Sequence, residues 1–188
     1  GDTFLVPSPI AHIGGSIYAF ECPLLLGTQA VLMQRWEADA AVTLMLEHHC
    51  THMAGATPFL TGLLAAAQNR GTRLPDLKVF ICGGASVAPS LIRRAADYFD
   101  RAVVTRVYGS TEVPVTTVGS PDDAHRAAET DGRPGIADVT LVDGEIRARG
   151  PQMLAGYLHA EDTRDAFDDN GYFRTGDLGR WTDDGYLV

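Results

Sequence analysis

Residues 77–85 have the sequence LKVFICGGA, and this stretch decides the class of fold. Leu77–Cys82 is an apolar run broken only by Lys78, which predicts a strand buried within a sheet. The glycine pair that follows predicts a tight connection at the strand's carboxyl end. The next segment, Pro89–Phe99, has helical spacing and begins with proline, a residue favoured in the first turn of a helix.

The same alternation of strand and helix extends through residues 1–118. Such alternation predicts βαβ units and a parallel sheet, whose ligands bind beyond the carboxyl ends of the strands. The glycine-containing segments 83–85 and 109–112 follow two of the predicted strands. The other strands are expected at Ala30–Met33, Thr51–Ala56 and Ala102–Val107, and the other helices at Gly15–Leu26 (buried), Ala38–His49 and Pro58–Gln68.

The character of the chain changes near residue 120. Residues 120–132 are polar, which predicts a surface loop, and Glu161–Phe167 predicts a short helix. Val139–Val142 and Glu145–Arg149 are joined by Asp143-Gly144, the signal of a hairpin with a type I′ turn. The sequence therefore predicts an α/β subdomain with a parallel sheet at 1–118 and a mostly antiparallel, barrel-like β subdomain at 119–188.

Composition narrows the class of protein. The 188 residues carry a formal charge of −9, and Lys78 is the only lysine, so we expect no nucleic-acid partner. Three cysteines without CxxC spacing predict free thiols in a cytoplasmic protein. The apolar stretch 17–33 is interrupted by charge, proline and glycine, so we expect no membrane span, and the first residues lack the pattern of a signal peptide.

The segment VYGSTE, residues 107–112, carries the strongest chemical signal. Tyr108 offers an aromatic face for a base, and Gly109 allows a close backbone approach. Ser110 and Thr111 offer hydroxyls to phosphate, and Glu112 offers a carboxylate for a magnesium ion that bridges phosphates. Without other motifs, an ordinary polar turn after a strand explains the segment equally well.

Three further segments carry weaker signals. Asp177, in the sequence RTGDL, could accept two hydrogen bonds from a ribose diol, or could belong to a simple turn. The glycines of CGGA would let a flat ligand lie against the backbone, although a tight turn is the more ordinary explanation. His12, near the start of an apolar helix, is more often structural than functional.

Five segments, taken in order, resemble the adenylate-forming (AMP-binding) superfamily in its acyl-CoA synthetase branch. They are PxxHxxG at 9–15, GGA at 83–85, YGSTE at 108–112, GEIRARGPQMLAGY at 144–157 and GYFRTGDLGRWTDDGYL at 171–187. The resemblance implies an internal fragment of that family's large N-terminal domain. It also implies ATP or AMP, Mg²⁺ and, as a substrate, CoA.

The resemblance implies a role for each matching position. Tyr108 would stack on adenine, Thr111 would contact phosphate, Glu112 would hold magnesium and Asp177 would bind ribose. The remaining nucleotide contacts would be Gly83, Gly84, Ala85, Gly109 and Ser110. His12 would lie beside the acyl group, and Ile13, Gly14 and Tyr18 would help to line that pocket.

The chain also departs from the family pattern. No loop rich in Ser, Thr and Gly and ending in Pro-Lys is present, nor are the hinge motif and the domain with the catalytic lysine. Phosphoryl chemistry needs charge neutralisation from several groups at once, so residues 1–188 alone are expected to form no acyl-adenylate.

The function implied is that of an ATP-dependent carboxylate–CoA ligase acting on a hydrophobic acid, since His12 has apolar neighbours. Two alternatives stay open. The acceptor could be a carrier-protein thiol, or the chain could be a non-catalytic nucleotide-binding module.

Overall fold

The structure is a computed structural model that describes residues 1–188, and the chain divides into two compact units. Residues 1–105 form the first unit and residues 106–188 form the second. The boundary that composition places after residue 118 stays a prediction. No helix in residues 1–188 is long and apolar enough to span a membrane.

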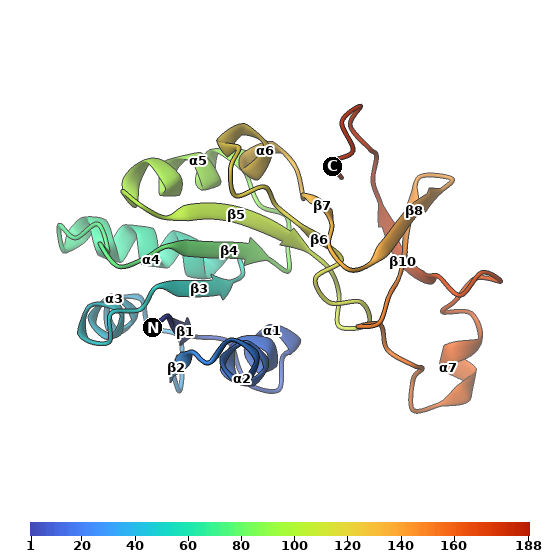
Figure 1. The fold of residues 1–188 in the computed structure, drawn as a ribbon, viewed down its shortest axis with the longest axis horizontal. Coiled ribbons are helices and arrows are strands. Elements are labelled where there is room, and N and C mark those ends of the chain that lie inside the picture. The colour runs from blue at the N-terminus through green and yellow to red at the C-terminus, as the bar shows by residue number, and fades with distance from the viewer. The chain divides into compact units, whose positions relative to one another are not determined.

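The first unit is an α/β structure built on parallel strands, as expected (Figure 1). The strands lie in the order β2-β1-β3-β4-β5, and the pairs β1–β2, β1–β3 and β3–β4 are parallel. The strands are β1 (Thr3–Val6), β2 (Gln29–Leu32), β3 (His52–Gly55), β4 (Val79–Gly83) and β5 (Val103–Tyr108). The helices are α1 (Ile13–Ser16), a π-helical turn η1 (Ile17–Glu21), α2 (Cys22–Leu26), α3 (Ala38–Glu47), α4 (Thr57–Asn69) and α5 (Pro89–Tyr98).

The core of this unit follows from the sequence pattern. In β4, Phe80 and Cys82 are completely buried, whereas Val79, Ile81 and Gly83 are only partly covered. In α4, Leu60, Leu63 and Leu64 recur at helical spacing and are all buried. Burying these apolar side chains removes their surface from water, which stabilises the packing of α4 against β4.

The helical segment after β1 differs in one respect from the expectation. Residues 13–26 are helical, but Leu24, Leu25 and Leu26 are 82%, 83% and 65% exposed, so the prediction that this helix is buried is wrong for its last turn. The segment contacts its own unit through Ala19 instead, which clusters with Phe4 and Val6. Apolar composition alone could not distinguish a buried helix from one with an uncovered end.

The second unit begins inside β5. The end of β5 pairs antiparallel with β6 (Thr117–Val118), and β6 pairs antiparallel with β7 (Arg133–Pro134). The polar segment 120–132, predicted to be a loop, contains the short helix α6 (Ala124–Glu129). Asp123 caps it by accepting a hydrogen bond from the Arg126 backbone N–H at 3.0 Å, a local signal that the loop prediction missed.

A separate antiparallel sheet, ordered β10-β9-β8, completes this unit. β8 (Asp138–Val142) and β9 (Glu145–Arg149) form the predicted hairpin. Both turn residues have positive φ, 53° at Asp143 and 82° at Gly144, which confirms the type I′ turn. The remaining elements are α7 (Ala160–Arg164), shorter than predicted, and β10 (Phe173–Leu178).

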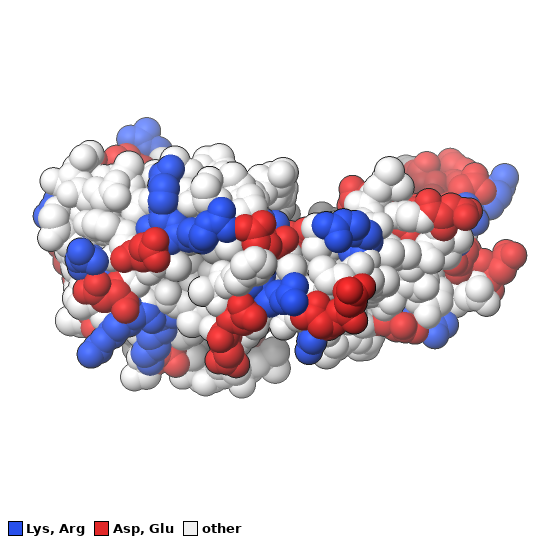
Figure 2. All heavy atoms as spheres, turned by 90° about the horizontal axis from the view of Figure 1, so that it is seen from above, with Lys and Arg blue, Asp and Glu red and all other residues white.

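A small apolar cluster joins the segments of the second unit. Val113, Ala148 and Phe173 are buried together, so the loop after β5, the strand β9 and the start of β10 share one core. The final residues are fixed separately, because the guanidinium groups of Arg126 and Arg133 lie 5.1 and 4.3 Å from the ring centre of Tyr186. On the face that Figure 2 shows, acidic and basic side chains are interspersed.

Candidate functional site

The loop that follows β5 holds the YGSTE segment in a tight turn. Ser110 Oγ accepts hydrogen bonds from the backbone N–H groups of Glu112 and Val113, both at 3.2 Å. Gly109 is required here, because a Cβ at this position would lie 2.7 Å from the backbone nitrogen of Val115. Ser110 therefore shapes the loop with its hydroxyl, whereas the side chain of Thr111 is exposed and available to a ligand.

The Glu112 carboxylate is held from a second segment of the same unit. Its Oε1 accepts a hydrogen bond from the phenol of Tyr157 at 3.0 Å, and its backbone oxygen accepts one from the Leu154 N–H at 2.8 Å. Partial burial opposes ionisation of Glu112. Hydrogen bonds from its own N–H, Ser110 and Tyr157 outweigh that effect and lower its pKa. Glu112 is thus a carboxylate at neutral pH.

The Thr175-Gly176-Asp177 segment is a bulge in the β9–β10 ladder. Arg174 pairs with Arg147 and Leu178 pairs with Glu145, so three residues of β10 face a single residue, Ile146. Thr175 Oγ1 donates to the Ile146 carbonyl at 2.6 Å and accepts from the Asp177 N–H at 3.1 Å. Gly176 has φ of 74°, a conformation that favours glycine. Bulges of this kind re-aim side chains, and here the side chain is Asp177.

The bulge brings Asp177 to Tyr108, 69 positions away in the chain. The Tyr108 phenol donates to Asp177 Oδ2 at 2.8 Å. Burial raises the pKa of Tyr108, and the adjacent Asp177 carboxylate raises it further, so the phenol keeps its proton and remains a donor. Two of the motifs therefore meet within the second unit, with Glu112 four residues after Tyr108.

The residues present fit a nucleotide and a magnesium ion. The exposed Asp177 carboxylate can accept from a diol, and the half-buried Tyr108 ring is of the type that stacks on a base. Magnesium is commonly held by one or two carboxylates together with substrate phosphates, which matches the ionised Glu112. No group of three or more His, Cys, Asp or Glu side chains in residues 1–188 could hold a metal ion unaided.

The other predicted nucleotide contacts lie in the first unit. Gly83 is the last residue of β4, and Gly84 and Ala85 follow it in exposed positions. Gly84 has φ of 82°, and a Cβ there would meet no atom within 4 Å, so its requirement for glycine comes from the backbone alone. This strip therefore follows the carboxyl end of its strand, as the sequence predicts.

The predicted acyl-pocket residues also have structural roles in the first unit. His12 caps α1, its Nδ1 accepting from the Gly14 N–H at 3.1 Å. Ile13 is the first residue of α1. Tyr18 packs against Phe4 with ring centres 5.9 Å apart, and burial raises the pKa of Tyr18 to about 12. These contacts account for part of the motif, and the role of these residues beside an acyl group stays a prediction.

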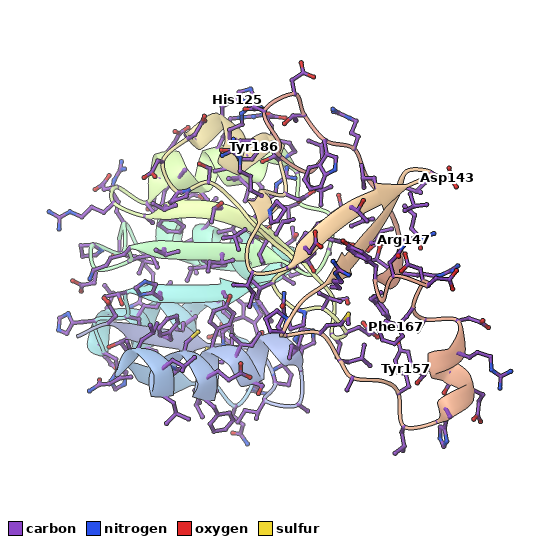
Figure 3. The ribbon with its side chains drawn as sticks, turned by 45° about the vertical axis from the view of Figure 1, so that its right-hand side comes forward. His125, Asp143, Arg147, Tyr157, Phe167 and Tyr186 are labelled. Atoms are coloured by element: carbon purple, nitrogen blue, oxygen red, sulfur yellow. The ribbon has the colours of Figure 1, made fainter.

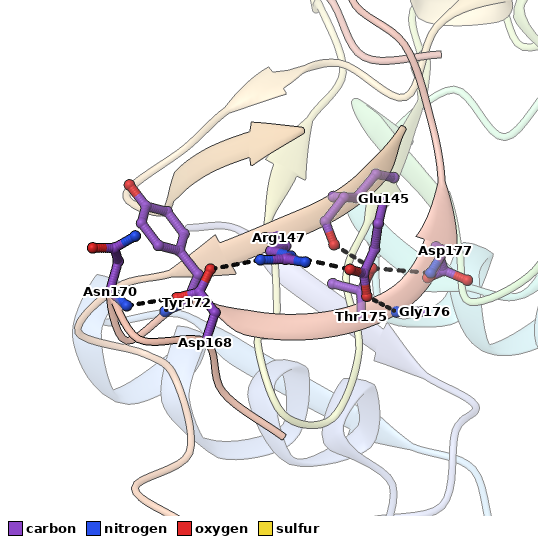
Figure 4. A network of polar contacts seen from close by, with 9 residues as sticks. Glu145, Arg147, Asp168, Asn170, Tyr172, Thr175, Gly176 and Asp177 are labelled. Carbon is purple, nitrogen blue, oxygen red and sulfur yellow. Dashed lines mark hydrogen bonds and ion pairs between the residues drawn. The ribbon is translucent and has the colours of Figure 1, made fainter. Parts of the chain in front are cut away.

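Sequence reasoning missed three residues that support the second unit's motifs. Tyr157 donates a hydrogen bond to Glu112. Glu145 accepts one from the Gly176 N–H in the bulge, and Arg147 bonds Glu145 in turn (Figure 4). Figure 3 labels Tyr157 and Arg147 among the side chains of this unit. All three lie in the segment GEIRARGPQMLAGY, which was matched as a motif without a role for each side chain. Only the register of β9 against β10 indicates which of its residues face the bulge.

The comparisons with known proteins establish the family. The family profile described as "AMP-binding enzyme" matches residues 1–158, so the chain belongs to the AMP-binding enzyme family. The medium-chain fatty-acid–CoA ligase of Escherichia coli is 32% identical over 201 residues, covering 99% of this chain and 35% of the relative. Triostin synthetase I of Streptomyces triostinicus is 33% identical over 207 residues, covering 98% of this chain and 37% of the relative. The chain thus spans about a third of the length of these curated relatives.

Solved structures agree on the fold. The N-terminal domain of FACL13 from Mycobacterium tuberculosis superposes with a TM-score of 0.87 at 29% identity, covering all of this chain and 50% of that one. The amide bond synthetase McbA from Marinactinospora thermotolerans superposes with a TM-score of 0.88 at 28% identity. The superposition covers 98% of this chain and 40% of McbA. These neighbours match the mixed α/β architecture with one largely parallel and one antiparallel sheet.

Proposed function

We propose that this chain supplies the adenine, ribose and magnesium contacts of an AMP-forming, ATP-dependent carboxylate–CoA ligase. The observation that carries the proposal is the 2.8 Å hydrogen bond between Tyr108 and Asp177, which joins two motifs across 69 positions. A ring that can stack on a base and a carboxylate that can bind a diol are in direct contact here, so both can engage one nucleoside.

The reaction then has two steps. A carboxylate oxygen of the acid attacks the α-phosphorus of ATP, the bond to pyrophosphate breaks, and acyl-AMP forms. A thiol sulfur next attacks the acyl carbon, loses its proton and expels AMP. In both steps the protein's contribution is positioning and charge stabilisation.

Each side chain has a defined part in that scheme. Asp177 accepts hydrogen bonds from the two ribose hydroxyls, and Tyr108 stacks on the adenine. The Thr111 hydroxyl donates a hydrogen bond to a phosphate oxygen. Glu112 would hold the magnesium ion, which supplies positive charge against the phosphates when bound. Tyr157 keeps the carboxylate of Glu112 in place through its phenol.

Relatives' names and the sequence support a hydrophobic acid as substrate. The Escherichia coli relative is named for medium-chain fatty acids, and a Rhodococcus jostii ligase, 31% identical, is named for a propanoyl group on a methyl-dioxo-octahydroindenyl ring system. The PxxHxxG segment itself carries Ile10 and Ile13 beside His12. We propose a medium-chain, aromatic or alicyclic acid on these grounds.

The second step needs a thiol acceptor. The family members that this chain resembles include CoA ligases, a triostin synthetase and an amide bond synthetase. CoA is favoured because several of the relatives are CoA ligases by name. Incubating the product of the complete gene with ATP, an acid and either CoA or a phosphopantetheinyl carrier protein will show which thiol consumes the adenylate.

The nucleotide contacts are tested by removing the ribose hydroxyls and the carboxylate in turn. We expect Asp177→Ala to weaken ATP binding by about 10- to 100-fold, since hydrogen bonds to a charged group are lost. The same substitution should hardly change binding of 2′,3′-dideoxyATP. If both nucleotides weaken equally, Asp177 does not read the ribose and the proposed site is wrong.

Turnover is tested by pyrophosphate release across straight-chain, aromatic and alicyclic acids with the product of the complete gene. Residues 1–188 by themselves are expected to release none, since they contain no Pro-Lys phosphate loop or catalytic-lysine domain. Turnover by that stretch alone would contradict this expectation.

A further inference from the structure

Three charged side chains of the second unit form a chain of contacts along β10. Arg147 donates through Nε to Glu145 Oε2 at 3.0 Å and through Nη1 to Asp168 Oδ2 at 2.9 Å. Glu145, Arg147 and Asp168 are well covered, with side chains 23%, 15% and 9% exposed. Figure 4 shows the three groups lying in a row that leads to the Thr175–Asp177 bulge.

One end of this row fixes the bulge itself. Glu145 Oε1 accepts a hydrogen bond from the Gly176 N–H at 3.2 Å. That N–H lies in the bulge, where three residues of β10 face one residue of β9 and the regular ladder is interrupted. An interrupted ladder leaves backbone donors without strand partners, and the carboxylate of Glu145 satisfies this one.

The other end fixes the start of β10. Asp168 Oδ1 accepts from the backbone N–H groups of Asn170 and Tyr172 at 2.9 and 3.0 Å, holding the turn that leads into the strand. Arg147 thus ties the entry of β10 and its bulge to a single side chain on β9. Its positive charge also offsets the two carboxylates that it joins, and a planar guanidinium suits two simultaneous acceptors.

We propose that Glu145 and Arg147 are positioning residues for ribose recognition, acting through the bulge that aims Asp177. The inference rests on the proposed function, because it assigns Asp177 to the ribose. Neither residue touches the nucleotide. Glu145 holds the Gly176 N–H, and Arg147 holds the Glu145 carboxylate in the orientation that this bond requires.

The chain offers a matched control on the same strand. Arg149 lies two positions along β9 and donates to Asp138 at 3.0 Å, an ion pair of the same kind. Its side chain and that of Asp138 are 47% and 54% exposed. Arg149 also donates to the Asn170 carbonyl at 3.0 Å and lies 4.4 Å from the ring centre of Tyr172, so its contacts are with the turn before β10 and not with the bulge. Arg149→Ala therefore removes a comparable charge and strand ion pair without disturbing the hydrogen bond to Gly176.

The first measurement needs no nucleotide. In Glu145→Ala, amide exchange at Gly176, followed by NMR, should quicken about tenfold, the equivalent of one lost hydrogen bond. Arg147→Met should quicken it less, Glu145→Gln should retain part of the protection through its amide oxygen, and Arg149→Ala should leave it unchanged. Unaltered exchange in Glu145→Ala would overturn the inference whatever the protein binds.

The second measurement compares the affinities for ATP and 2′,3′-dideoxyATP in the product of the complete gene. Outer-shell partners that orient metal ligands contribute about 10- to 100-fold to metal affinity. Glu145 and Arg147 orient Asp177 in a comparable way, so Glu145→Ala and Arg147→Met should weaken ATP binding by about tenfold. Both should change dideoxyATP binding less than about twofold. A general loss of structure would weaken both nucleotides together, which distinguishes positioning from folding.

The two proposals fail in different ways. If Asp177→Ala leaves the ratio of the two affinities unchanged, the ribose assignment is wrong. If Asp177→Ala collapses that ratio while Glu145→Ala and Arg147→Met leave it as in Arg149→Ala, the ribose assignment stands and the positioning role is wrong.

Discussion

The substitution Gly176→Ala tests the backbone conformation on which the direction of Asp177 depends. Gly176 has φ of 74°, and a Cβ built there would meet no atom within 4 Å. The substitution therefore introduces no clash and keeps the backbone N–H that donates a hydrogen bond to Glu145. Its cost is conformational, because L-residues are disfavoured in the left-handed region.

Two opposing effects set the change in the free energy of unfolding that Gly176→Ala should cause. The left-handed conformation costs about 1–2 kcal/mol, and alanine recovers about 0.4–1 kcal/mol by restricting the unfolded chain. The net expectation is a loss of about 1 kcal/mol in the free energy of unfolding. With a urea dependence of about 1–3 kcal/mol per molar, the midpoint should fall by about 0.3–1 M.

A matched glycine separates local stability from ribose recognition. Gly185 has φ of 79° and equally open surroundings, but lies in a turn after β10. Gly185→Ala should lower the urea midpoint by a similar amount while leaving the ratio of ATP to dideoxyATP affinity unchanged. Gly176→Ala should lower both. If Gly176→Ala is as stable as the parent chain, or if both variants alter the ratio equally, the argument from backbone strain is refuted.

Three other predictions follow from single contacts. Phe80→Ala removes a completely buried ring and should lower the free energy of unfolding by about 3–5 kcal/mol in urea titrations, whereas a loss below about 1 kcal/mol would contradict its place in the core. Tyr108→Phe keeps the ring but loses the donor to Asp177, so ATP affinity should fall by about fivefold, and a loss as large as that of Tyr108→Ala would show that the hydrogen bond and not the ring dominates. The backbone N–H of Tyr172 is the main cause that lowers the pKa of Asp168, so this carboxylate stabilises the fold above its ordinary pKa and loses that contribution as pH falls through the lowered value. Asp168→Asn should therefore reduce stability at neutral pH and flatten its decline in acid, and an unchanged pH profile of unfolding would exclude the contribution.

Local sequence patterns predicted much of the fold. The apolar run before Gly83 became β4, and the Asp143-Gly144 pair became a type I′ turn, since both signals depend only on neighbouring residues. The patterns failed where burial depends on distant segments. The leucines that end α2 are exposed. A local signal was missed as well, because Asp123 caps α6 within a polar stretch that was predicted to be a loop.

The sequence by itself determined the residue types that we propose for the chemistry: an aromatic ring, hydroxyls and carboxylates next to glycines. Their meeting was decided by the tertiary structure. Val113, Ala148 and Phe173 share a core that holds the loop after β5 against β9 and β10, and the bulge at Gly176 then directs Asp177 to Tyr108. Local sequence patterns cannot predict the contact between Tyr108 and Asp177, because strand register and bulge position arise from pairing between segments that are far apart in the chain.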